Sequence, residues 1–131
     1  MNFKMKNIEH IGIAVKNLDA ANDLFTKLLG KPSYKTEIVE SERVKTSFFK
    51  IGSNKIELLE GMDDGSTITK FIEKMGEGVH HIAFEVENIN EEIKRLQDEG
   101  FEVLNNMPKQ GADNKLVVFL HPRSTNGVLI E

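Results

Sequence analysis

The stretch His10-Ile11-Gly12-Ile13-Ala14-Val15-Lys16-Asn17-Leu18 returns in altered form as His81-Ile82-Ala83-Phe84-Glu85-Val86-Glu87-Asn88-Ile89. The second copy begins 71 positions after the first, in a chain of 131 residues. Each copy opens with a histidine on an apolar, β-branched run that is typical of a strand. The repeat therefore predicts a duplicated unit, whose equivalent residues surround a pseudo-twofold axis and can face one point.

The residues around each copy give both halves the pattern β-α-β-β-β. In the first half we expect a strand over 8–15, a helix that begins at the N-cap Asp19 and ends at Gly30, and strands over 33–39, 44–51 and 55–59. A short helix capped by Ser66 and ended by Gly76 follows. In the second half we expect a strand over 79–86, a helix capped by Asn90, and strands over 101–104, 116–120 and 127–131.

These elements predict an α+β fold of two paired βαβββ modules, about 6–61 and about 78–131, in a single domain over 1–131. With 39% hydrophobic and 29% charged residues, the composition is that of a soluble domain. The net charge of −4, without a basic cluster, argues against a nucleic-acid or membrane partner. The absence of cysteine excludes disulfides and thiolate chemistry. Lacking a leader or a long apolar run, the protein is expected to be cytoplasmic.

The last strand of each module carries an Ile-Glu pair, Ile56-Glu57 in the first and Ile130-Glu131 in the second. A single histidine in an apolar strand is usually a core residue, and a single glutamate near a strand end usually faces solvent. Matched types at matched positions favour a shared site instead. Two imidazoles and two carboxylates suit Zn²⁺, Ni²⁺, Co²⁺ or Mn²⁺. We therefore predict one divalent metal ion bound by His10, Glu57, His81 and Glu131, with open positions for catalysis.

Longer motifs resemble the vicinal oxygen chelate (glyoxalase/bleomycin resistance/dioxygenase) superfamily and, within it, the methylmalonyl-CoA epimerases. They are Gly76-Glu77-Gly78-Val79-His80-His81-Ile82-Ala83-Phe84-Glu85-Val86, Ile56-Glu57-Leu58-Leu59-Glu60 and Phe119-Leu120-His121-Pro122-Arg123-Ser124-Thr125-Asn126-Gly127-Val128-Leu129-Ile130-Glu131. The resemblance implies a curved mixed sheet around one divalent ion on the four residues named above, a homodimer and an acyl-CoA substrate. The implied reaction interconverts (R)- and (S)-methylmalonyl-CoA by proton abstraction through a metal-chelated enolate.

Epimerisation needs an acid/base group on each side of the planar enolate. Glu131 and Glu57 come from opposite modules and are the two predicted catalytic residues, although a permanent metal ligand such as Glu57 is a poor base unless it dissociates. Some related epimerases carry a further glutamate on the strand before the Ile-Glu strand. Here Lys45 or Thr46 takes that position, so the second base is left open.

Other residues have weaker interpretations. His80 points to the opposite strand face from His81 and is interpreted either as structural or as a residue that supports a metal ligand, while the role of His121 is open. Loop positions make Lys109, Arg123 and Ser124 candidates for contact with coenzyme A.

Two alternative functions remain. A glyoxalase I (lactoylglutathione lyase) would use the same four metal ligands, so the quartet does not separate it from an epimerase. A non-enzymatic small-molecule-binding protein of the superfamily would not need the metal. The 119–131 tail favours the epimerase, and retention of all four ligand positions argues against the binding protein.

Overall fold

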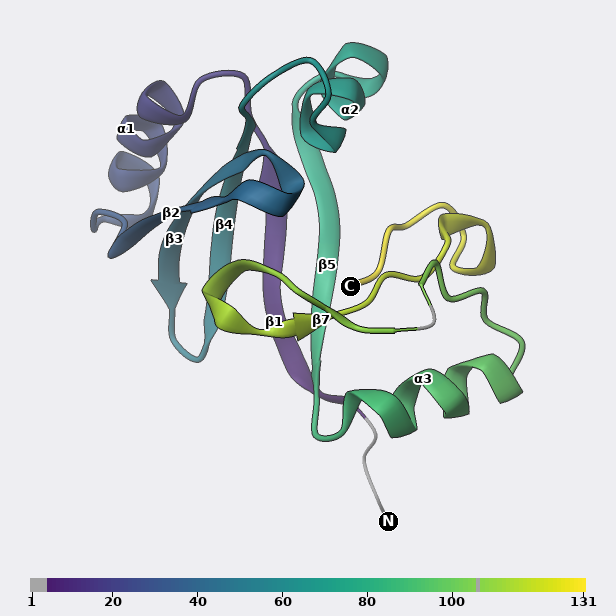
Figure 1. The fold of residues 1–131 in the computed structure, drawn as a ribbon. Coiled ribbons are helices and arrows are strands. Elements are labelled where there is room, and N and C mark those ends of the chain that lie inside the picture. Colours follow the sequence, from purple (N-terminus) through teal and green to yellow (C-terminus); the bar gives the residue numbers. More distant parts are fainter. Residues whose placement is uncertain (1–4, 106) are drawn as a thin grey trace. The chain divides into compact units, whose positions relative to one another are not determined.

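The protein is described by a computed structural model that covers residues 5–105 and 107–131 (Figure 1). The chain forms two compact units. The first, here called the N-terminal unit, is His10–His80, and the second, the C-terminal unit, combines His81–Glu131 with the residues that precede His10. The elements in chain order are β1 (Met5–Ala14), α1 (Leu18–Leu29), β2 (Lys35–Val39), η1 (Glu40–Glu42), β3 (Val44–Ile51), β4 (Asn54–Gly61), α2 (Thr67–Met75), β5 (Gly78–Val86), α3 (Ile89–Asp98), β6 (Lys109–Gln110), η2 (Ala112–Asn114), β7 (Leu116–Val117) and η3 (Pro122–Ser124).

The sheet of the N-terminal unit has the strand order β2-β3-β4-β1 and is mixed. Strand β1 runs parallel to β4, whereas β2–β3 and β3–β4 are antiparallel. Side chains alternate between faces along a strand, and directly paired residues share a face. The register therefore places His10, Glu57, Phe48 and Lys35 on one face, here called the His10 face.

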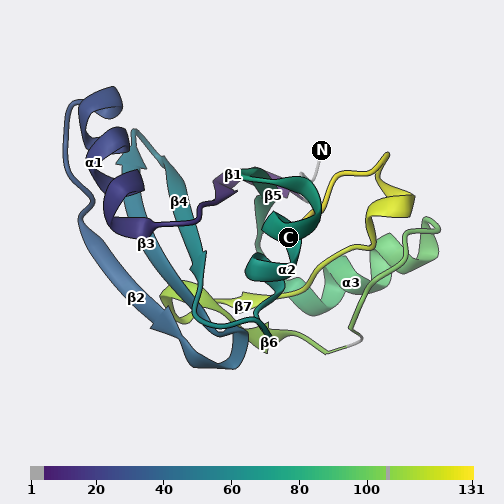
Figure 2. The same ribbon diagram turned by 90° about the horizontal axis from the view of Figure 1, so that it is seen from above.

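Helix α1 covers the other face of this sheet (Figures 1 and 2). Leu18 of the helix forms a buried apolar cluster with Phe49 and Leu58 of the strands, and the Phe25 and Phe49 ring centroids lie 6.3 Å apart. The helix ends at Gly30, as expected, where a φ of 78° favours glycine. This packing buries the apolar face and leaves the His10 face for other contacts.

Helix α2 packs on one end of the His10 face. Its residue Ile68 joins Ala14, Val44 and Leu59 in a second buried cluster. The expected cap is confirmed, since the Ser66 hydroxyl accepts a hydrogen bond from the Ile68 N–H at 3.2 Å. Glu57 and Lys55 lie further along the strands, beyond this cluster.

The C-terminal unit repeats the strand pairing of the N-terminal unit. Ile82 forms a parallel bridge with Ile130. Leu120 forms two antiparallel bridges, one with Ile130 and one with Val103. In the N-terminal unit, Ile11 pairs in parallel with Ile56 in the same way. The predicted α+β class is confirmed, with a mixed sheet and three α-helices among the residues that the structure describes.

The predicted strand over 79–86 is confirmed as β5, whereas the predicted lengths of the three later strands were wrong. The stretches 101–104 and 127–131 are held by backbone hydrogen bonds and isolated bridges rather than by regular strands. Leu116–Val117 instead pairs with Lys109–Gln110, which was expected to be a loop. The 3₁₀ turn η3 and the positive φ angles of Asn126 (57°) and Gly127 (84°) interrupt the extended path of the chain at the start of the stretch 127–131.

The predicted N-caps of α1 and α3 were displaced by two residues. Asn17 caps α1 by accepting a hydrogen bond from the Ala20 N–H at 2.9 Å, and Asn88 caps α3 by accepting one from the Glu91 N–H at 3.1 Å. Both asparagines have an extended backbone, with φ of −136° and −132°. A cap needs this conformation, whereas the predicted Asp19 and Asn90 lie inside the first helical turn.

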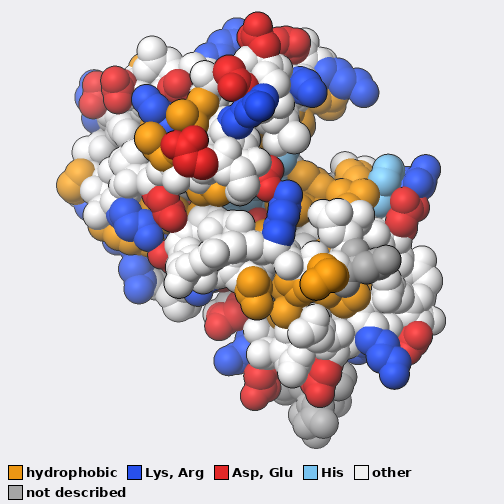
Figure 3. Space-filling view, in the orientation of Figure 1, with side chains coloured by type: hydrophobic (Ala, Val, Ile, Leu, Met, Phe, Trp, Pro, Cys, Tyr) orange, Lys and Arg blue, Asp and Glu red, His pale blue; other side chains and the backbone are white. Residues whose placement is uncertain are grey.

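Among the described residues, none of the helices has both the length and the apolar character needed to cross a membrane. On the face shown in Figure 3, Lys and Arg side chains stand among Asp and Glu side chains and do not gather in one basic patch. This distribution agrees with the negative net charge and offers no electrostatic footprint for nucleic acid on that face.

We expect Asn17→Ala to lower the free energy of unfolding by about 1 kcal/mol, because a helix N-terminus loses its side-chain acceptor. Asp19→Asn is the control, since it removes only a charge from the first turn and should cost less than about 0.5 kcal/mol. Urea unfolding followed by circular dichroism measures both. A larger loss for Asp19→Asn than for Asn17→Ala would contradict the cap assignment.

Candidate metal centre

The N-terminal unit buries an imidazole against a carboxylate. His10 Nδ1 lies 3.1 Å from Glu57 Oε2, and the two side chains are 10% and 4% exposed. The parallel register of β1 and β4 brings them together, because Glu57 stands two residues beyond Lys55, the direct partner of His10. An isolated carboxylate at this depth would be costly, so the imidazole or a cation has to compensate it.

The C-terminal unit contains an equivalent pair. His81 Nε2 lies 3.2 Å from Glu131 Oε1, and the side chains are 6% and 13% exposed. The ring of His81 packs edge-on against Phe119, with ring centroids 5.9 Å apart. Aromatic packing of this kind fixes the orientation of the imidazole beside the carboxylate.

The backbone of Glu131 is held by two hydrogen bonds to β5. Its N–H donates to the Ile82 carbonyl at 3.0 Å, and its carbonyl accepts a hydrogen bond from the Phe84 N–H at 2.8 Å. This ladder fixes the carboxylate next to His81 and gives the last strand of the C-terminal unit the same role as β4 has in the N-terminal unit.

The geometry of each pair suits donors to one divalent ion. Two donor atoms at about 2.1 Å from a common ion lie about 3.0 Å apart at a right angle and about 3.4 Å apart in a tetrahedron. The observed separations of 3.1 Å and 3.2 Å fall between these values. Each unit therefore presents one nitrogen and one oxygen that fit adjacent coordination positions.

The strand register separates the two residues that sequence reasoning left open as replacements for a further glutamate. Thr46 pairs with Leu59 and so lies on the His10 face, where it is buried. Lys45 pairs with Glu60 on the opposite face. The position next to the Glu57 row is therefore occupied by a threonine.

Three lysines on the His10 face were not found by sequence reasoning. Lys55 pairs directly with both His10 and Lys50, while Lys35 pairs with Phe48. The Nζ atoms of Lys35 and Lys55 lie 4.7 Å and 6.0 Å from the centroid of the buried Phe48 ring. These ammonium groups supply positive charge to a face that carries carboxylates.

The remaining predicted residues take mostly structural positions. The His80 ring packs edge-on against Phe71, with centroids 4.9 Å apart, in agreement with a structural role. His121 Nδ1 accepts a hydrogen bond from the Arg123 N–H at 3.1 Å, and the Ser124 hydroxyl donates to the His121 carbonyl at 2.8 Å. His121 and Ser124 thus stabilise the turn that contains them.

Arg123 is engaged with a neighbouring carboxylate. Its Nε and one terminal nitrogen each lie 2.7 Å from an oxygen of Glu102. This bidentate hydrogen bonding holds the pKa of the Glu102 carboxyl below its ordinary range and raises the pKa of Arg123. The guanidinium group of Arg123 therefore forms a surface ion pair with Glu102.

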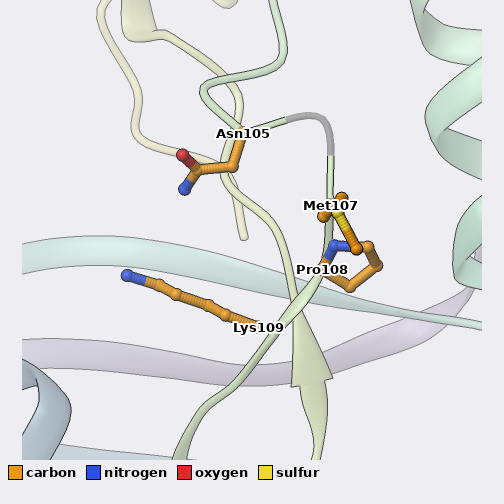
Figure 4. Close-up of a pocket in the computed structure, with 4 residues that line it drawn as sticks. All are labelled: Asn105, Met107, Pro108 and Lys109. Carbon is orange, nitrogen blue, oxygen red and sulfur yellow. The ribbon is translucent and has the colours of Figure 1, made fainter.

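Lys109 lines an open pocket of about 540 Å³ together with Asn105, Met107 and Pro108 (Figure 4). The side chains of Asn105 and Lys109 extend to the same side in this view. Lys109, one of the three loop residues predicted to contact coenzyme A, thus lies beside a pocket.

Two half-chains of matching topology, each with a histidine–glutamate pair between its first and last strands, define the class of proteins built from duplicated βαβββ modules. Residues 9–119 match the family model for the glyoxalase/bleomycin resistance protein/dioxygenase superfamily. The chain belongs to this superfamily, as its motifs had indicated.

Similar proteins span nearly the whole chain. The uncharacterized protein YqjC of Bacillus subtilis is 39% identical over 127 residues, which cover 97% of this chain and 91% of that protein. The ethylmalonyl-CoA/methylmalonyl-CoA epimerase of Cereibacter sphaeroides is also 39% identical, over 126 residues that cover 95% and 94%. A structure of Streptomyces coelicolor methylmalonyl-CoA epimerase in complex with 2-nitronate-propionyl-CoA superimposes with a TM-score of 0.92 at 34% identity, covering 96% and 92%.

The Glu102–Arg123 pair predicts a pH-dependent contribution to stability. Because the folded state lowers the pKa of the Glu102 carboxyl, the stabilisation is present above the pKa of the unfolded chain and is lost as pH falls through the lower folded value. A double-mutant cycle with Glu102→Gln and Arg123→Met, measured by urea unfolding, should show a coupling at pH 7 that shrinks on acidification. A coupling that stays constant down to acid pH would contradict the assignment.

Proposed function

We propose that the protein is a metal-dependent epimerase that interconverts the (R) and (S) forms of methylmalonyl-CoA or a closely similar acyl-CoA. The observation that carries the proposal is the pair of buried histidine–glutamate contacts at equivalent positions of the two modules. The relatives named as methylmalonyl-CoA epimerases, which match across the full length of the modules, support the choice of reaction. The acyl-CoA complexes of such relatives support the choice of substrate.

In this proposal His10, Glu57, His81 and Glu131 hold one divalent ion, and all four side chains are at most 13% exposed. When bound, such an ion would stabilise the negative charge that develops on a substrate oxygen as a proton leaves the neighbouring carbon. The carbon between a thioester and a carboxylate carries a weakly acidic proton of this kind. Stabilisation that appears only as the charge develops is what accelerates the reaction.

Glu131 is proposed as one acid/base group. It removes the proton from one side of the substrate carbon or, in the reverse direction, delivers a proton to that side, and its backbone hydrogen bonds to β5 keep the carboxylate in place during the transfer. Glu57 is the more deeply buried of the two carboxylates, at 4% exposure against 13%, and is proposed chiefly as a ligand. A homodimer remains part of the proposal.

Deuterium incorporation tests the reaction directly. In D₂O the purified protein loaded with Co²⁺ should incorporate deuterium at C2 of methylmalonyl-CoA and interconvert its epimers, and prior removal of metal with a chelator should abolish both. Readdition of Co²⁺ should restore them. Absence of metal-dependent exchange in the loaded protein would refute the proposed reaction. Turnover of the methylglyoxal–glutathione hemithioacetal in its place would instead support a lactoylglutathione lyase.

Metal content tests the ligand set independently of turnover. Glu57→Gln, Glu131→Gln and His81→Ala should each lower bound Co²⁺ at a fixed free concentration by at least about tenfold, because each removes a charged or nitrogen donor. His80→Ala is the matched control for His81→Ala, since the neighbouring imidazole packs on Phe71. Inductively coupled plasma mass spectrometry after dialysis measures the content. Full occupancy in the Glu57 and Glu131 variants would exclude the proposed centre.

A further inference from the structure

The His10 face carries a second carboxylate that the proposed metal site does not use. Glu37 of β2 pairs directly with Thr46 of β3, on the face that holds His10 and Glu57. Among the described residues of β2 to β4, Glu37 and Glu57 are the two carboxylates on this face, because Glu60 falls on the opposite one. The two carboxylates have different environments, which suggests different roles.

Glu57 is fixed by burial and by its contact with His10, at 4% exposure and 3.1 Å. The Glu37 side chain is 31% exposed, so its carboxylate is open to water and can exchange a proton with it. An acid/base group must be reset by solvent after each proton transfer, whereas a ligand need not be. On this criterion Glu37 is the better acid/base group of the two.

The position of Glu37 in the sheet suits a group that faces a bound substrate. Strands β2 and β4 are two strand spacings apart, which is about 10 Å across the sheet. Glu37 lies one row along the strands from Glu57 and from Phe48, the direct β3 partner of Glu57. The diagonal between the two glutamates passes beside Thr46, whose short side chain is buried. A small acyl group held near Glu57 would therefore have the Glu37 carboxylate to one side, within reach directly or through one water.

Lys35 orients Glu37 from the same strand. Its Nζ lies 3.7 Å from Glu37 Oε2 and 4.7 Å from the centroid of the buried Phe48 ring. The ring gives the ammonium group a rigid support, and the ammonium group in turn draws the carboxylate toward the His10 face. A partly exposed pair at this distance is weak, so it orients the carboxylate without removing it from reaction.

We infer that Glu37 is the second acid/base group of the epimerisation, acting on the side of the substrate opposite to Glu131; this inference rests on the proposed function. In one direction the Glu37 carboxylate removes the proton from C2, and the electron pair of the C–H bond moves into the adjacent carbonyl as an enolate. The protonated Glu131 carboxyl then delivers a proton to the other side of C2. The reverse direction exchanges the two roles, and solvent resets both carboxyl groups.

The test separates proton exchange from inversion. Each epimer is incubated separately in D₂O with Co²⁺-loaded protein, and both C2 deuteration and appearance of the other epimer are followed. Wild type should show both processes with both epimers. Glu37→Gln should slow interconversion by about 10²- to 10⁴-fold, the usual contribution of one acid/base group, while the epimer whose C2 proton faces Glu131 still exchanges it with retention. Glu37→Asp should recover part of the interconversion.

Controls distinguish the possible failures. Glu40→Gln, an exposed carboxylate in the neighbouring 3₁₀ turn, should behave as wild type, and Glu37→Gln should keep the wild-type Co²⁺ content. Interconversion by Glu37→Gln within about threefold of wild type would overturn this inference while leaving the proposed function intact. Equal loss of interconversion and of exchange with both epimers would also overturn it. Absence of exchange in the wild type would refute the proposed function itself.

Discussion

The parallel pairing of the first and last strand of each module is the constraint on which the rest of the structure depends. It places Glu57 beside His10 through β1 and β4, and Glu131 beside His81 through β5 and the end of the chain. Because side chains alternate between faces, a slip of one residue would send each glutamate to the opposite side of its sheet. The apolar packing that fixes this register therefore also determines the candidate metal centre.

One face of the N-terminal sheet contributes mainly to stability, and the other carries the candidate functional residues. The face under α1 is apolar and buries Phe49 and Leu58, which favours folding. The His10 face instead places Lys50 directly opposite Lys55 and buries the carboxylate of Glu57. Like charges in direct pairs destabilise a sheet, and proteins accept such local costs mainly at functional sites. The concentration of these unfavourable charge placements on the His10 face agrees with the proposed location of the substrate.

Burial also divides the carboxylates by role. Glu57 is held by an imidazole in a nearly closed environment, which suits a permanent ligand. Glu131 also lies beside an imidazole but is the more accessible of the two, in agreement with its proposed second role as an acid/base group. Glu37 lies at an edge strand, paired with a lysine and open to water. A ligand benefits from exclusion of water, because its interaction with a cation strengthens in a low dielectric. A group that repeatedly takes up and releases a proton instead needs contact with water.

The sequence by itself determined the duplication, the α+β class, the ends of α1 and α2 at Gly30 and Gly76, and the four residues of the two histidine–glutamate pairs, since these follow from local periodicity and from matched positions. The same repeat aligned Asn17 with Asn88, the true caps, but acidic and amide residues two positions later obscured them. Only the tertiary structure decided that Thr46 rather than Lys45 lies on the His10 face, and that Glu37 joins it there. The register between strands depends on packing among distant segments, and periodicity within one strand carries no information about it.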